Sequence, residues 1–406
     1  MTFSKRTVRD VPLDGKTVLV RADYNVPQDE NGKIDDDFRI RASLPTIEYL
    51  LARGCKVVVI SHLGRPEGKE KKYTLEPVAE RLAKLMKRNV LFVEDCIGSR
   101  VKMAVKRAPN GSVIVLENLR FYEEEEKNDQ AFAKKIAAAT GARYFVQDGF
   151  GVVHRAHAST AAITMELPSV AGLLLEREVS TITKAMRHPK QPLVAVLGGA
   201  KVSDKLPLIE TIIPIASQIL IGGAMANTFF AAKGIAIGKS KFEPEQIPEV
   251  AKIYELAARK SGVESVDEFI VLPSDVAVAT EVNERARRKN VSIGAIGDDD
   301  QALDIGNASI EDFVRRASEA QTVIWNGTLG FAELPAFSNG SARLALALAS
   351  HPDITSIVGG GDTADFVRHW DEKEGDSFTH VSTGGGASLE LMAGMKLPGV
   401  ESLLDA

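Results

Sequence analysis

Short runs of branched apolar residues alternate with amphipathic segments along almost the whole chain, and this alternation constrains the fold more than any other feature. Each run has the length of a strand and is apolar on both faces, as in the interior of a parallel sheet. The pattern predicts an α/β fold with helices on both faces of parallel sheets. In the first half the predicted strands are Thr17–Ala22, Lys56–Ser61, Val90–Val93, Val113–Glu117 and Tyr144–Gln147, and the predicted helices are Ile40–Ala52, Leu75–Lys87 and Gln130–Thr140.

The same alternation resumes in the second half, after a long, partly amphipathic segment, Val170–His188, that predicts a connecting helix. A chain of 406 residues is too long for one ordinary core. We therefore expect two similar Rossmann-like domains, residues 1–170 and 190–395, joined by a hinge helix at 171–189 across a cleft. The predicted elements of the second half are strands Leu193–Leu197, Gln218–Ile221, Glu268–Leu272, Thr322–Trp325, Thr355–Val358 and Phe378–Ser382, and helices Pro248–Ser261 and Ser309–Ala320.

Charge and composition argue against several classes of partner. The net charge is −5, so there is no overall basic field to attract nucleic acid or an anionic membrane. The N-terminal residues do not resemble a secretory signal, and no apolar run approaches the ~18 residues of a membrane span. Cys55 and Cys96 lie beside strand-like runs and predict buried thiols. These features predict a cytoplasmic protein, and the lack of an extra apolar segment favours a monomer.

The stretch Pro192–Lys205 is the strongest local indication of a ligand. A buried strand ends at the Gly198-Gly199 turn, and helix-compatible residues, Ala200–Leu206, follow. A strand, a glycine turn and a helix start together present backbone N–H groups to an anion. Lys201 and Lys205 would share one side of such a helix. Two solvated lysines are the simpler reading, but their place at the end of a strand favours a site for phosphate or carboxylate.

Polar residues follow nearly every predicted strand of the first half. Any one of them could be a solvated or structural residue, but several arginines at one sheet edge would repel each other without a ligand. Because a guanidinium matches carboxylate and phosphate oxygens in pairs, the set predicts a site for a small polyanion. It offers no aromatic platform for nucleic acid. Its members are Asp23, Asn25, Arg39, His62, Arg65, Arg120 and Arg155.

Glycine-rich turns recur at the predicted strand ends of the second half. They lie in the stretches Ile221–Phe229, Ile324–Glu333, Ile357–Phe366 and Val381–Glu390. One such turn could serve tight packing alone, but several on one edge indicate a nucleotide site. Asp362 could be a helix N-cap or a Mg²⁺ ligand, of which the metal role is favoured, and Glu333 could take a ribose hydroxyl.

The familiar nucleotide-binding motifs are absent from the sequence, and its acidic run is not expected to bind a ligand. Gly234–Ser240 is one residue short of a P-loop and does not follow a strand, and no G-x-G-x-x-G opens the first strand–helix turn. The HRD and DFG elements of protein kinases are absent. The acidic run Glu123–Glu126 predicts a solvated loop or helix start without a ligand role.

With RADYNVP, SHLGRP, ENLRF, HRAHAS, LGGAKVSDK, WNG, GGGDT and STGGGASLE in this order, the chain resembles the phosphoglycerate kinase family from Arg21 to Glu390. The resemblance implies reversible phosphoryl transfer from 1,3-bisphosphoglycerate to MgADP, giving 3-phosphoglycerate and MgATP. It also implies that a C-terminal tail, residues 396–406, returns to the first domain. The chain departs from the usual family pattern at Gly149, at Ala224 and over Thr328–Ala332.

The resemblance also implies which residues hold each ligand. Phosphoglycerate is expected on Asp23, Asn25, Arg39, His62, Leu63, Gly64, Arg65, Arg120 and Arg155. The nucleotide, ATP or ADP with Mg²⁺, is expected on Lys205, Gly223, Leu303, Asn326, Glu333, Gly360, Gly361, Asp362 and Thr363, with Asp362 as the metal ligand.

The chemistry needs no general base, because a carboxylate nucleophile is already ionised at pH 7. Charge neutralisation and in-line positioning remain, and we expect Arg39 and Lys201 to hold the transferring phosphoryl oxygens. Helix-start N–H groups near Gly361, Gly384 and Gly385 would assist. Two alternatives remain, a two-domain dehydrogenase and a phosphoglycerate-sensing binding protein. A coupled assay with ATP and 3-phosphoglycerate would distinguish both of them from a kinase.

Overall fold

The computed structural model describes residues 3–30 and 32–406. Its chain divides into two compact units, Met1–Ser180 with Lys396–Ala406, and Thr181–Met395. Over the described residues, no helix combines the length and apolarity needed to cross a bilayer.

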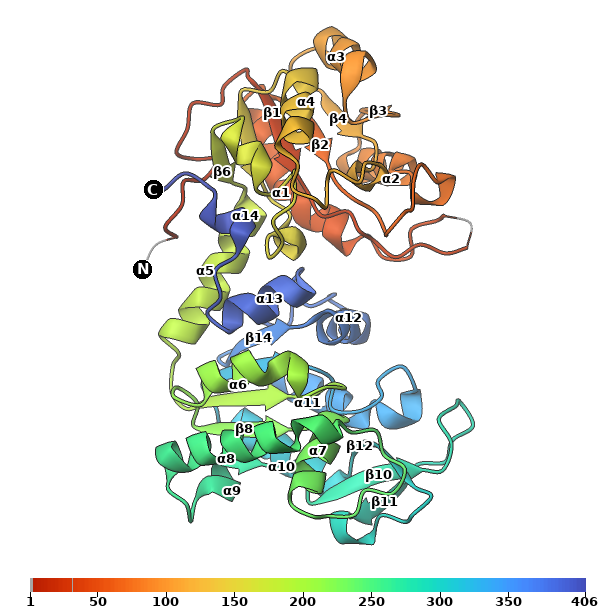
Figure 1. Cartoon of the computed structure of the whole chain (residues 1–406), viewed down its shortest axis with the longest axis vertical. Coiled ribbons are helices and arrows are strands. Elements are labelled where there is room, and N and C mark those ends of the chain that lie inside the picture. The colour runs from red at the N-terminus through yellow and green to blue at the C-terminus, as the bar shows by residue number, and fades with distance from the viewer. Residues whose placement is uncertain (1–2, 31) are drawn as a thin grey trace. The chain divides into compact units, whose positions relative to one another are not determined.

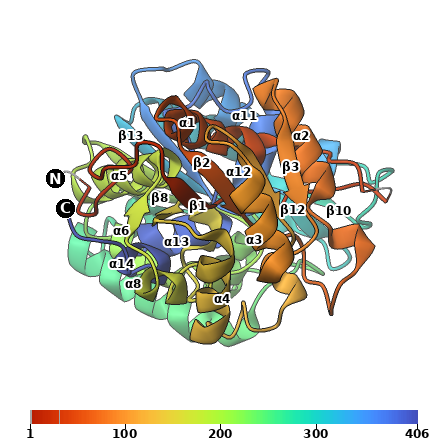
Figure 2. The ribbon, with the colours of Figure 1, turned by 90° about the horizontal axis from the view of Figure 1, so that it is seen from above.

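Unit 1 contains a six-stranded parallel sheet in the order β3-β4-β2-β1-β5-β6. Helices cover both of its faces, since Val18 and Val20 pack with α1 and α2 while the intervening Leu19 packs with α3 and α4. Figure 2 shows α1 and α4 on opposite sides of β1 and β2. The strands are β1 (Thr17–Arg21), β2 (Lys56–Ile60), β3 (Val90–Val93), β4 (Val113–Leu116), β5 (Tyr144–Gln147) and β6 (Ser169–Ala171), and the helices are α1 (Phe38–Ala52), α2 (Glu76–Met86), α3 (Gly98–Arg107) and α4 (Gln130–Thr140).

The last residues of the chain belong to unit 1. The short helix α14 (Pro398–Glu401) lies in this segment, and Leu397, Val400 and Leu403 are buried. The segment is bonded to the unit by backbone hydrogen bonds, from Leu404 N–H to Ser169 O at 3.0 Å and from Gly399 N–H to Val153 O at 2.9 Å. In Figure 1 this C-terminal segment, drawn in dark blue, lies beside β6. Helix α5 (Leu173–Arg187) begins in unit 1, and the boundary between the units falls within it.

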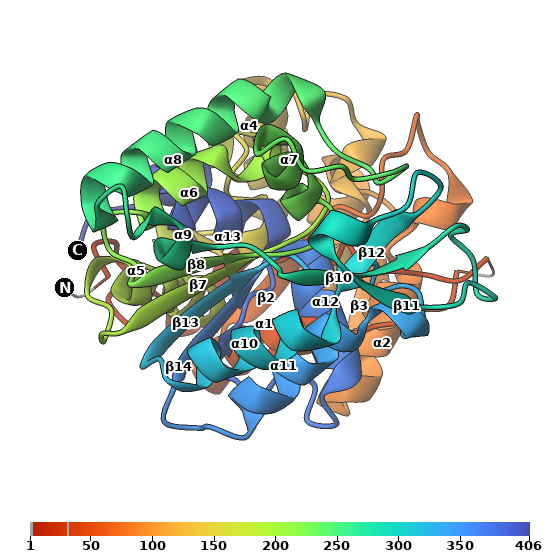
Figure 3. The same cartoon turned by 90° about the horizontal axis from the view of Figure 1, so that it is seen from below.

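Unit 2 contains a second six-stranded parallel sheet, in the order β15-β14-β13-β7-β8-β9. Figure 3 shows α6 and α8 on one side of its strands and α10 and α11 on the other. Its strands are β7 (Leu193–Leu197), β8 (Gln218–Ile221), β9 (Ile270–Val271), β13 (Thr322–Asn326), β14 (Thr355–Gly359) and β15 (His380–Val381). Its helices are α6 (Leu206–Ile212), α7 (Met225–Ala232), α8 (Ile247–Ser261), α9 (Val266–Phe269), α10 (Asn307–Ser318), α11 (Asn339–Ala349), α12 (Gly361–Trp370) and α13 (Gly385–Met392).

The fold class predicted from the alternation, two similar Rossmann-like α/β halves with parallel sheets, is confirmed. The sequence missed a three-stranded antiparallel sheet in unit 2, formed by β10 (Asp275–Ala279), β11 (Lys289–Ser292) and β12 (Gln301–Ile305). It also missed α3 and β6. The predicted strand Glu268–Leu272 is wrong in its first half, which belongs to α9. Cys55 and Cys96 are buried free thiols, as predicted.

The prediction of a helix over Ala200–Leu206, directly after β7, is wrong. A 3₁₀ turn covers Ser203–Lys205, and α6 starts only at Leu206, so Lys201 and Lys205 do not share a helix face. The cause is a tertiary contact. The carboxylate of Glu243 accepts hydrogen bonds from Val202 N–H at 2.5 Å and from Ser203 N–H at 3.2 Å, which ties this backbone to a distant loop.

Candidate functional site

The carboxyl ends of the unit 1 strands collect the cationic residues predicted from the sequence. Arg39, from the first turn of α1, donates from Nη1 to Asp23 Oδ2 at 2.9 Å and to the carbonyl oxygen of Asn25 at 3.1 Å. Asn25 in turn accepts from Gly64 N–H at 2.8 Å. The structure therefore joins the loops that follow β1 and β2, and the start of α1, into one connected surface.

Arg120 extends this surface from the loop after β4. Its Nη1 donates to the carbonyl oxygen of Gly64 at 2.7 Å, and its Nη2 lies 3.0 Å from Glu126 Oε1. Burial lowers the pKa of Arg120, as do the charges of Arg155 and Arg65, against the opposing effect of Glu126. The guanidinium groups of this cluster are thus close enough to repel one another.

Arg65 and Arg155 are the exposed members of the cluster. Neither forms an ion pair with a carboxylate among the residues that the structure describes, and Arg155 donates only to His154, from Nε to Nε2 at 3.2 Å. Two uncompensated guanidinium groups in a crowded cationic cluster favour a ligand with several negative charges.

Two neutral histidines lie beneath this surface. Burial lowers the pKa of His62 well below its ordinary value, and the charges of Arg21, Arg120 and Arg39 lower it further. Burial and Arg21 lower the pKa of His157 to about 4. Both imidazoles are therefore uncharged at neutral pH and act as hydrogen-bonding groups.

One prediction about this region is wrong. The acidic run Glu123–Glu126 is not uniformly solvated, because Glu125 is fully buried. Its Oε1 lies 3.9 Å from Arg21 Nη2 and accepts from the Ser159 hydroxyl at 2.5 Å. Sequence reasoning missed Arg21 and Glu125, because a charge in a strand or in an acidic run gives no sign of burial.

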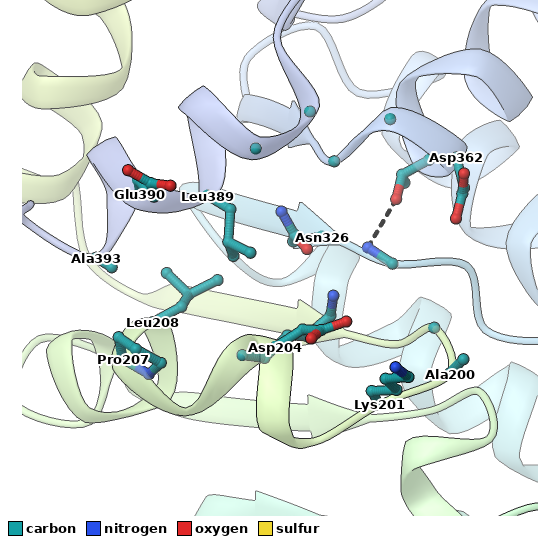
Figure 4. A pocket seen from close by; sticks show the side chains of 18 of the residues that line it. Ala200, Lys201, Asp204, Pro207, Leu208, Asn326, Asp362, Leu389, Glu390 and Ala393 are labelled. Carbon is teal, nitrogen blue, oxygen red and sulfur yellow. Dashed lines mark hydrogen bonds between the residues drawn. The ribbon is translucent and has the colours of Figure 1, made fainter. Parts of the chain in front are cut away.

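In unit 2, a cavity of about 620 Å³ opens at the carboxyl ends of β7, β13 and β14. Figure 4 shows that Lys201, Asp204, Asn326 and Asp362 point into its polar part, whereas Pro207, Leu208 and Leu389 form an apolar part. The predicted residues that line the cavity are Lys201, Lys205, Asn326, Gly360, Gly361, Asp362, Thr363 and Gly385. Gly223, Leu303, Glu333 and Gly384 do not line it.

Two helix N-termini meet at the wall of this cavity. A Cβ on Gly385, the first residue of α13, would lie only 3.0 Å from the backbone nitrogen of Gly361, the first residue of α12. Gly360 caps α12 at a φ of 91°, which other residues rarely adopt. Each helix start carries roughly half a positive charge, so their meeting creates a strongly favourable place for phosphate oxygens.

Polar groups in the cavity lack partners within the protein. The side-chain nitrogen of Asn326 is buried and makes no hydrogen bond to any described residue. Burial lowers the pKa of Lys205, opposed by the charges of Asp204 and Asp362, and its Nζ forms no ion pair with a carboxylate in the described chain. Such groups are expensive to leave unpaired, which favours a polar ligand here.

The carboxylate of Asp362 is exposed in the first turn of α12, where Gly360 holds the N-cap position. Asp362 makes no hydrogen bond or ion pair with the residues that the structure describes. Mg²⁺ is usually bound by one or two carboxylates together with substrate phosphates and water. Asp362, with Asp204 on the same cavity, fits a Mg²⁺ that arrives with a nucleotide.

The remaining predicted nucleotide residues lie in unit 2 but outside this cavity. A Cβ on Gly223 would lie 2.5 Å from the backbone nitrogen of Gly199, so this glycine permits the close packing of two strand ends. Leu303 is half-buried against the small cluster of Ala277, Ala279 and Phe337. Glu333 is exposed in the loop between β13 and α11.

A cluster of arginines lies on one Rossmann-like unit, and a cavity lined by helix N-termini and lysines lies on the other. Together they are typical of an α/β phosphotransferase. A sequence profile described as phosphoglycerate kinase matches residues 8–395 of the chain. The chain belongs to the phosphoglycerate kinase family, and this membership supports a glycolytic kinase role.

Curated relatives and solved structures agree with this assignment. The chain is 46% identical to phosphoglycerate kinase of Thermosynechococcus vestitus over 100% of both chains, and 45% identical to cytosolic phosphoglycerate kinase of Triticum aestivum over 98% of both. Phosphoglycerate kinase from Coxiella burnetii is similar in structure, with a TM-score of 0.84, 37% identity and 98% of each chain covered.

Proposed function

We propose that the enzyme transfers the acyl phosphate of 1,3-bisphosphoglycerate to MgADP, giving 3-phosphoglycerate and MgATP, reversibly. A terminal oxygen of the ADP β-phosphate attacks the phosphorus, the bond between phosphorus and the acyl oxygen breaks, and the carboxylate leaves. The observation that carries this proposal is that one chain holds both a cationic cluster with uncompensated arginines and a cavity where two helix N-termini meet two lysines.

The cationic cluster of unit 1 is proposed as the site of the phosphoglycerate. Arg65 and Arg155 are available for phosphate oxygens, because no described carboxylate pairs with them. Arg39 and Arg120 are held in place by Asp23 and Gly64. The proposed binding set is Asp23, Asn25, Arg39, His62, Leu63, Gly64, Arg65, Arg120 and Arg155.

The cavity of unit 2 is proposed as the site of the nucleotide phosphates. Lys205 and the unpaired amide nitrogen of Asn326 would bind phosphate oxygens near the Gly360–Thr363 turn. Asp362 would hold Mg²⁺, which supplies neutralising charge to the phosphates when it is bound with the nucleotide. Gly223, Leu303 and Glu333 are proposed to contact the rest of the nucleotide, outside the cavity.

Catalysis in this proposal depends on charge stabilisation rather than on a general base. Lys201 makes no ion pair with another described residue and is exposed to the cavity, so its charge is available to the transferring phosphoryl group. Backbone N–H groups at Gly361, Gly384 and Gly385 would share that task with Arg39. Residues 1–170 and 190–395 are proposed as the two substrate domains and 171–189 as a hinge whose bending brings the bound substrates together and excludes water.

The enzyme is further proposed to act as a cytoplasmic monomer. The wheat relative is described as cytosolic, which supports that location. Size-exclusion chromatography with light scattering tests the oligomeric state.

A coupled assay with ATP, Mg²⁺ and 3-phosphoglycerate tests the proposed reaction. The expected result is steady formation of ADP that requires all three components. A protein that binds 3-phosphoglycerate without turnover would instead be a sensor. Binding of a nicotinamide cofactor, with oxidation or reduction of the substrate, would indicate a dehydrogenase and overturn the proposal.

A further inference from the structure

A fully buried polar network lies under the cationic cluster of unit 1. Arg21, at the end of β1, Glu125 and Ser159 have no exposed surface. Arg21 donates from Nε to the Ser159 hydroxyl at 2.7 Å, and that hydroxyl donates to Glu125 Oε1 at 2.5 Å. Glu125 also accepts from Ser159 N–H at 3.0 Å, so the two turns that carry Glu125 and Ser159 are bonded to each other beside the guanidinium.

The Nη2 group of the Arg21 guanidinium faces the imidazole of His62. Arg21 Nη2 lies 3.3 Å from His62 Nδ1, and both side chains are buried. Arginine has donors and no acceptor, so Nδ1 must be the accepting nitrogen. The competing partner, Asp23 Oδ1, lies 4.0 Å from Nδ1, which is beyond hydrogen-bonding distance. A neutral imidazole that accepts at Nδ1 carries its proton at Nε2.

The opposite nitrogen of the ring is available to a ligand. His62 Nε2 forms no hydrogen bond with any residue that the structure describes. An N–H at this position is a donor, which suits an anionic oxygen, whereas an unprotonated Nε2 would present a lone pair and repel it.

We propose that Arg21, fixed by Glu125 and Ser159, is a positioning residue that holds His62 in the Nε2–H tautomer, so that this imidazole donates a hydrogen bond to an anionic oxygen of the phosphoglycerate. The inference rests on the proposed function for the identity of the ligand. The tautomer itself follows from the contacts of Arg21 alone. Without Arg21, the Nδ1–H tautomer could turn toward Asp23, and the donor facing the ligand would be lost.

The tautomer is measured directly by long-range ¹H–¹⁵N correlation spectra of the protein labelled at histidine, with His62 assigned by His62→Gln. The expected spectrum of the unliganded enzyme shows His62 protonated at Nε2 near neutral pH. An Nδ1–H pattern, or a charged ring, would overturn the proposal whether or not the enzyme turns over.

A variant that removes Arg21 and its buried partner together tests the positioning role. Arg21→Met alone would leave Glu125 as an unpaired buried charge, so Arg21→Met is combined with Glu125→Gln. The expected result is loss of the single Nε2–H pattern and a rise of roughly 10- to 100-fold in KM for 3-phosphoglycerate, the value of a hydrogen bond to a charged group, with KM for ATP little changed. An unchanged tautomer and KM would refute the role.

Two further variants separate positioning from general damage. The double variant Arg53→Met with Asp14→Asn removes an arginine–carboxylate pair from the surface of the same unit. It should leave both the tautomer of His62 and KM for 3-phosphoglycerate unchanged. In His62→Gln the amide nitrogen replaces Nε2 without any tautomer, so adding the Arg21 and Glu125 changes to it should raise KM for 3-phosphoglycerate far less. An equal rise in the His62→Gln background would show that Arg21 does not act through His62.

The turnover assay and the histidine spectrum test the proposed function and the proposed role of Arg21 separately. An enzyme that lacks turnover with ATP and 3-phosphoglycerate would contradict the proposed function, while the spectrum would still decide the tautomer. If the combined variant fails to fold, two measurements still test the proposal: the spectrum of the unaltered enzyme, and KM for 3-phosphoglycerate in His62→Gln compared with His62→Ala. The Gln variant should retain most of the affinity for 3-phosphoglycerate. An equal loss of affinity in both variants would overturn the role of His62 as a donor.

Discussion

At the scale of single residues, the charged groups of the two units differ in how completely the protein itself satisfies them. Arg39 and Arg120 are anchored by a carboxylate or carbonyl oxygen, whereas Arg65 and Lys201 pair with no described carboxylate. An anchored cation is preorganised, and an unpaired one keeps its full charge for a ligand. The two kinds together are suited to binding and then stabilising phosphate.

Replacing Lys201 by Ala should lower kcat by roughly 100-fold or more, because the charge that we propose to stabilise the transition state is lost. KM values for MgATP and 3-phosphoglycerate should change little, since the nucleotide phosphates are assigned to Lys205. Steady-state kinetics measure both. Lys252→Ala removes an exposed lysine of α8 in the same unit and serves as the control. A change confined to KM would contradict the assignment.

Because the pKa of His157 is about 4 when folded and 6.5 in its ordinary state, the unfolded chain binds a proton in this interval that the folded chain does not. This group therefore makes the free energy of unfolding fall as the pH falls from about 6.5 to about 4. His157→Gln should show a smaller fall over that range than the unaltered enzyme, measured by urea unfolding at several pH values. An equal fall in both proteins would contradict the prediction.

At the scale of elements, the start of α5 is fixed by groups that come from elsewhere in unit 1. Asp148, directly after β5, accepts through Oδ1 from Leu174 N–H at 3.0 Å, and the Thr46 hydroxyl accepts from Leu173 N–H at 2.9 Å. A Cβ on Gly172 would lie 2.0 Å from Asp148 Oδ1, so the close approach requires glycine. The start of the element proposed as a hinge is thus anchored to the sheet that carries the cationic cluster.

Asp148→Ala should lower the free energy of unfolding by about 0.5–2 kcal/mol, the usual value of a helix cap. Asp148→Asn keeps the accepting oxygen, and burial raises the pKa of Asp148 to about 7, so a neutral side chain is well tolerated there. The Asn variant should therefore lose clearly less stability than the Ala variant in denaturant unfolding. Equal losses would show that Asp148 does not act as a cap.

At the scale of the whole molecule, residues far apart in the sequence complete one compact unit. The C-terminal residues pack on unit 1 through Leu397, Val400 and Leu403, and the side chain of Lys5 contacts Asp405 at 2.7 Å. The first described residues and the last residues of the chain therefore lie side by side in unit 1.

Deleting residues 397–406 should lower the free energy of unfolding by roughly 4–8 kcal/mol, because three apolar side chains lose their burial. Thermal and denaturant unfolding followed by circular dichroism measure the change. Asp405→Ala, which breaks only an exposed ion pair, should cost no more than about 1 kcal/mol. A truncated enzyme as stable as the full chain would contradict the importance of this segment.

Small-angle X-ray scattering tests the proposed domain closure on the full chain. The radius of gyration should decrease further with 3-phosphoglycerate and MgATP together than with either ligand alone, because only the pair must be brought into contact and shielded from water. A sample with both ligands that is no more compact than the samples with one would count against closure.

The sequence was sufficient for features that depend on local periodicity. Val90–Val93, Gln130–Thr140 and Leu193–Leu197 were predicted with the bounds that the structure shows, because each contains one unbroken pattern of apolar residues between turn residues. The glycine turns at strand ends were found for the same reason, since a glycine after a buried strand indicates a turn without knowledge of its neighbours.

Features that depend on distant partners could not be read from the sequence. β11 is polar and largely exposed, so no alternation marks it, and only its pairing with β10 makes it a strand. The conformation at Lys201 depends on Glu243, and the burial of Glu125 depends on Arg21 and Ser159. The sequence by itself determined the two α/β units and predicted the kinds of ligand that each could bind. The tertiary structure alone decided which charges are paired, because Coulomb and hydrogen-bond energies depend on distances between groups that the order of residues does not specify.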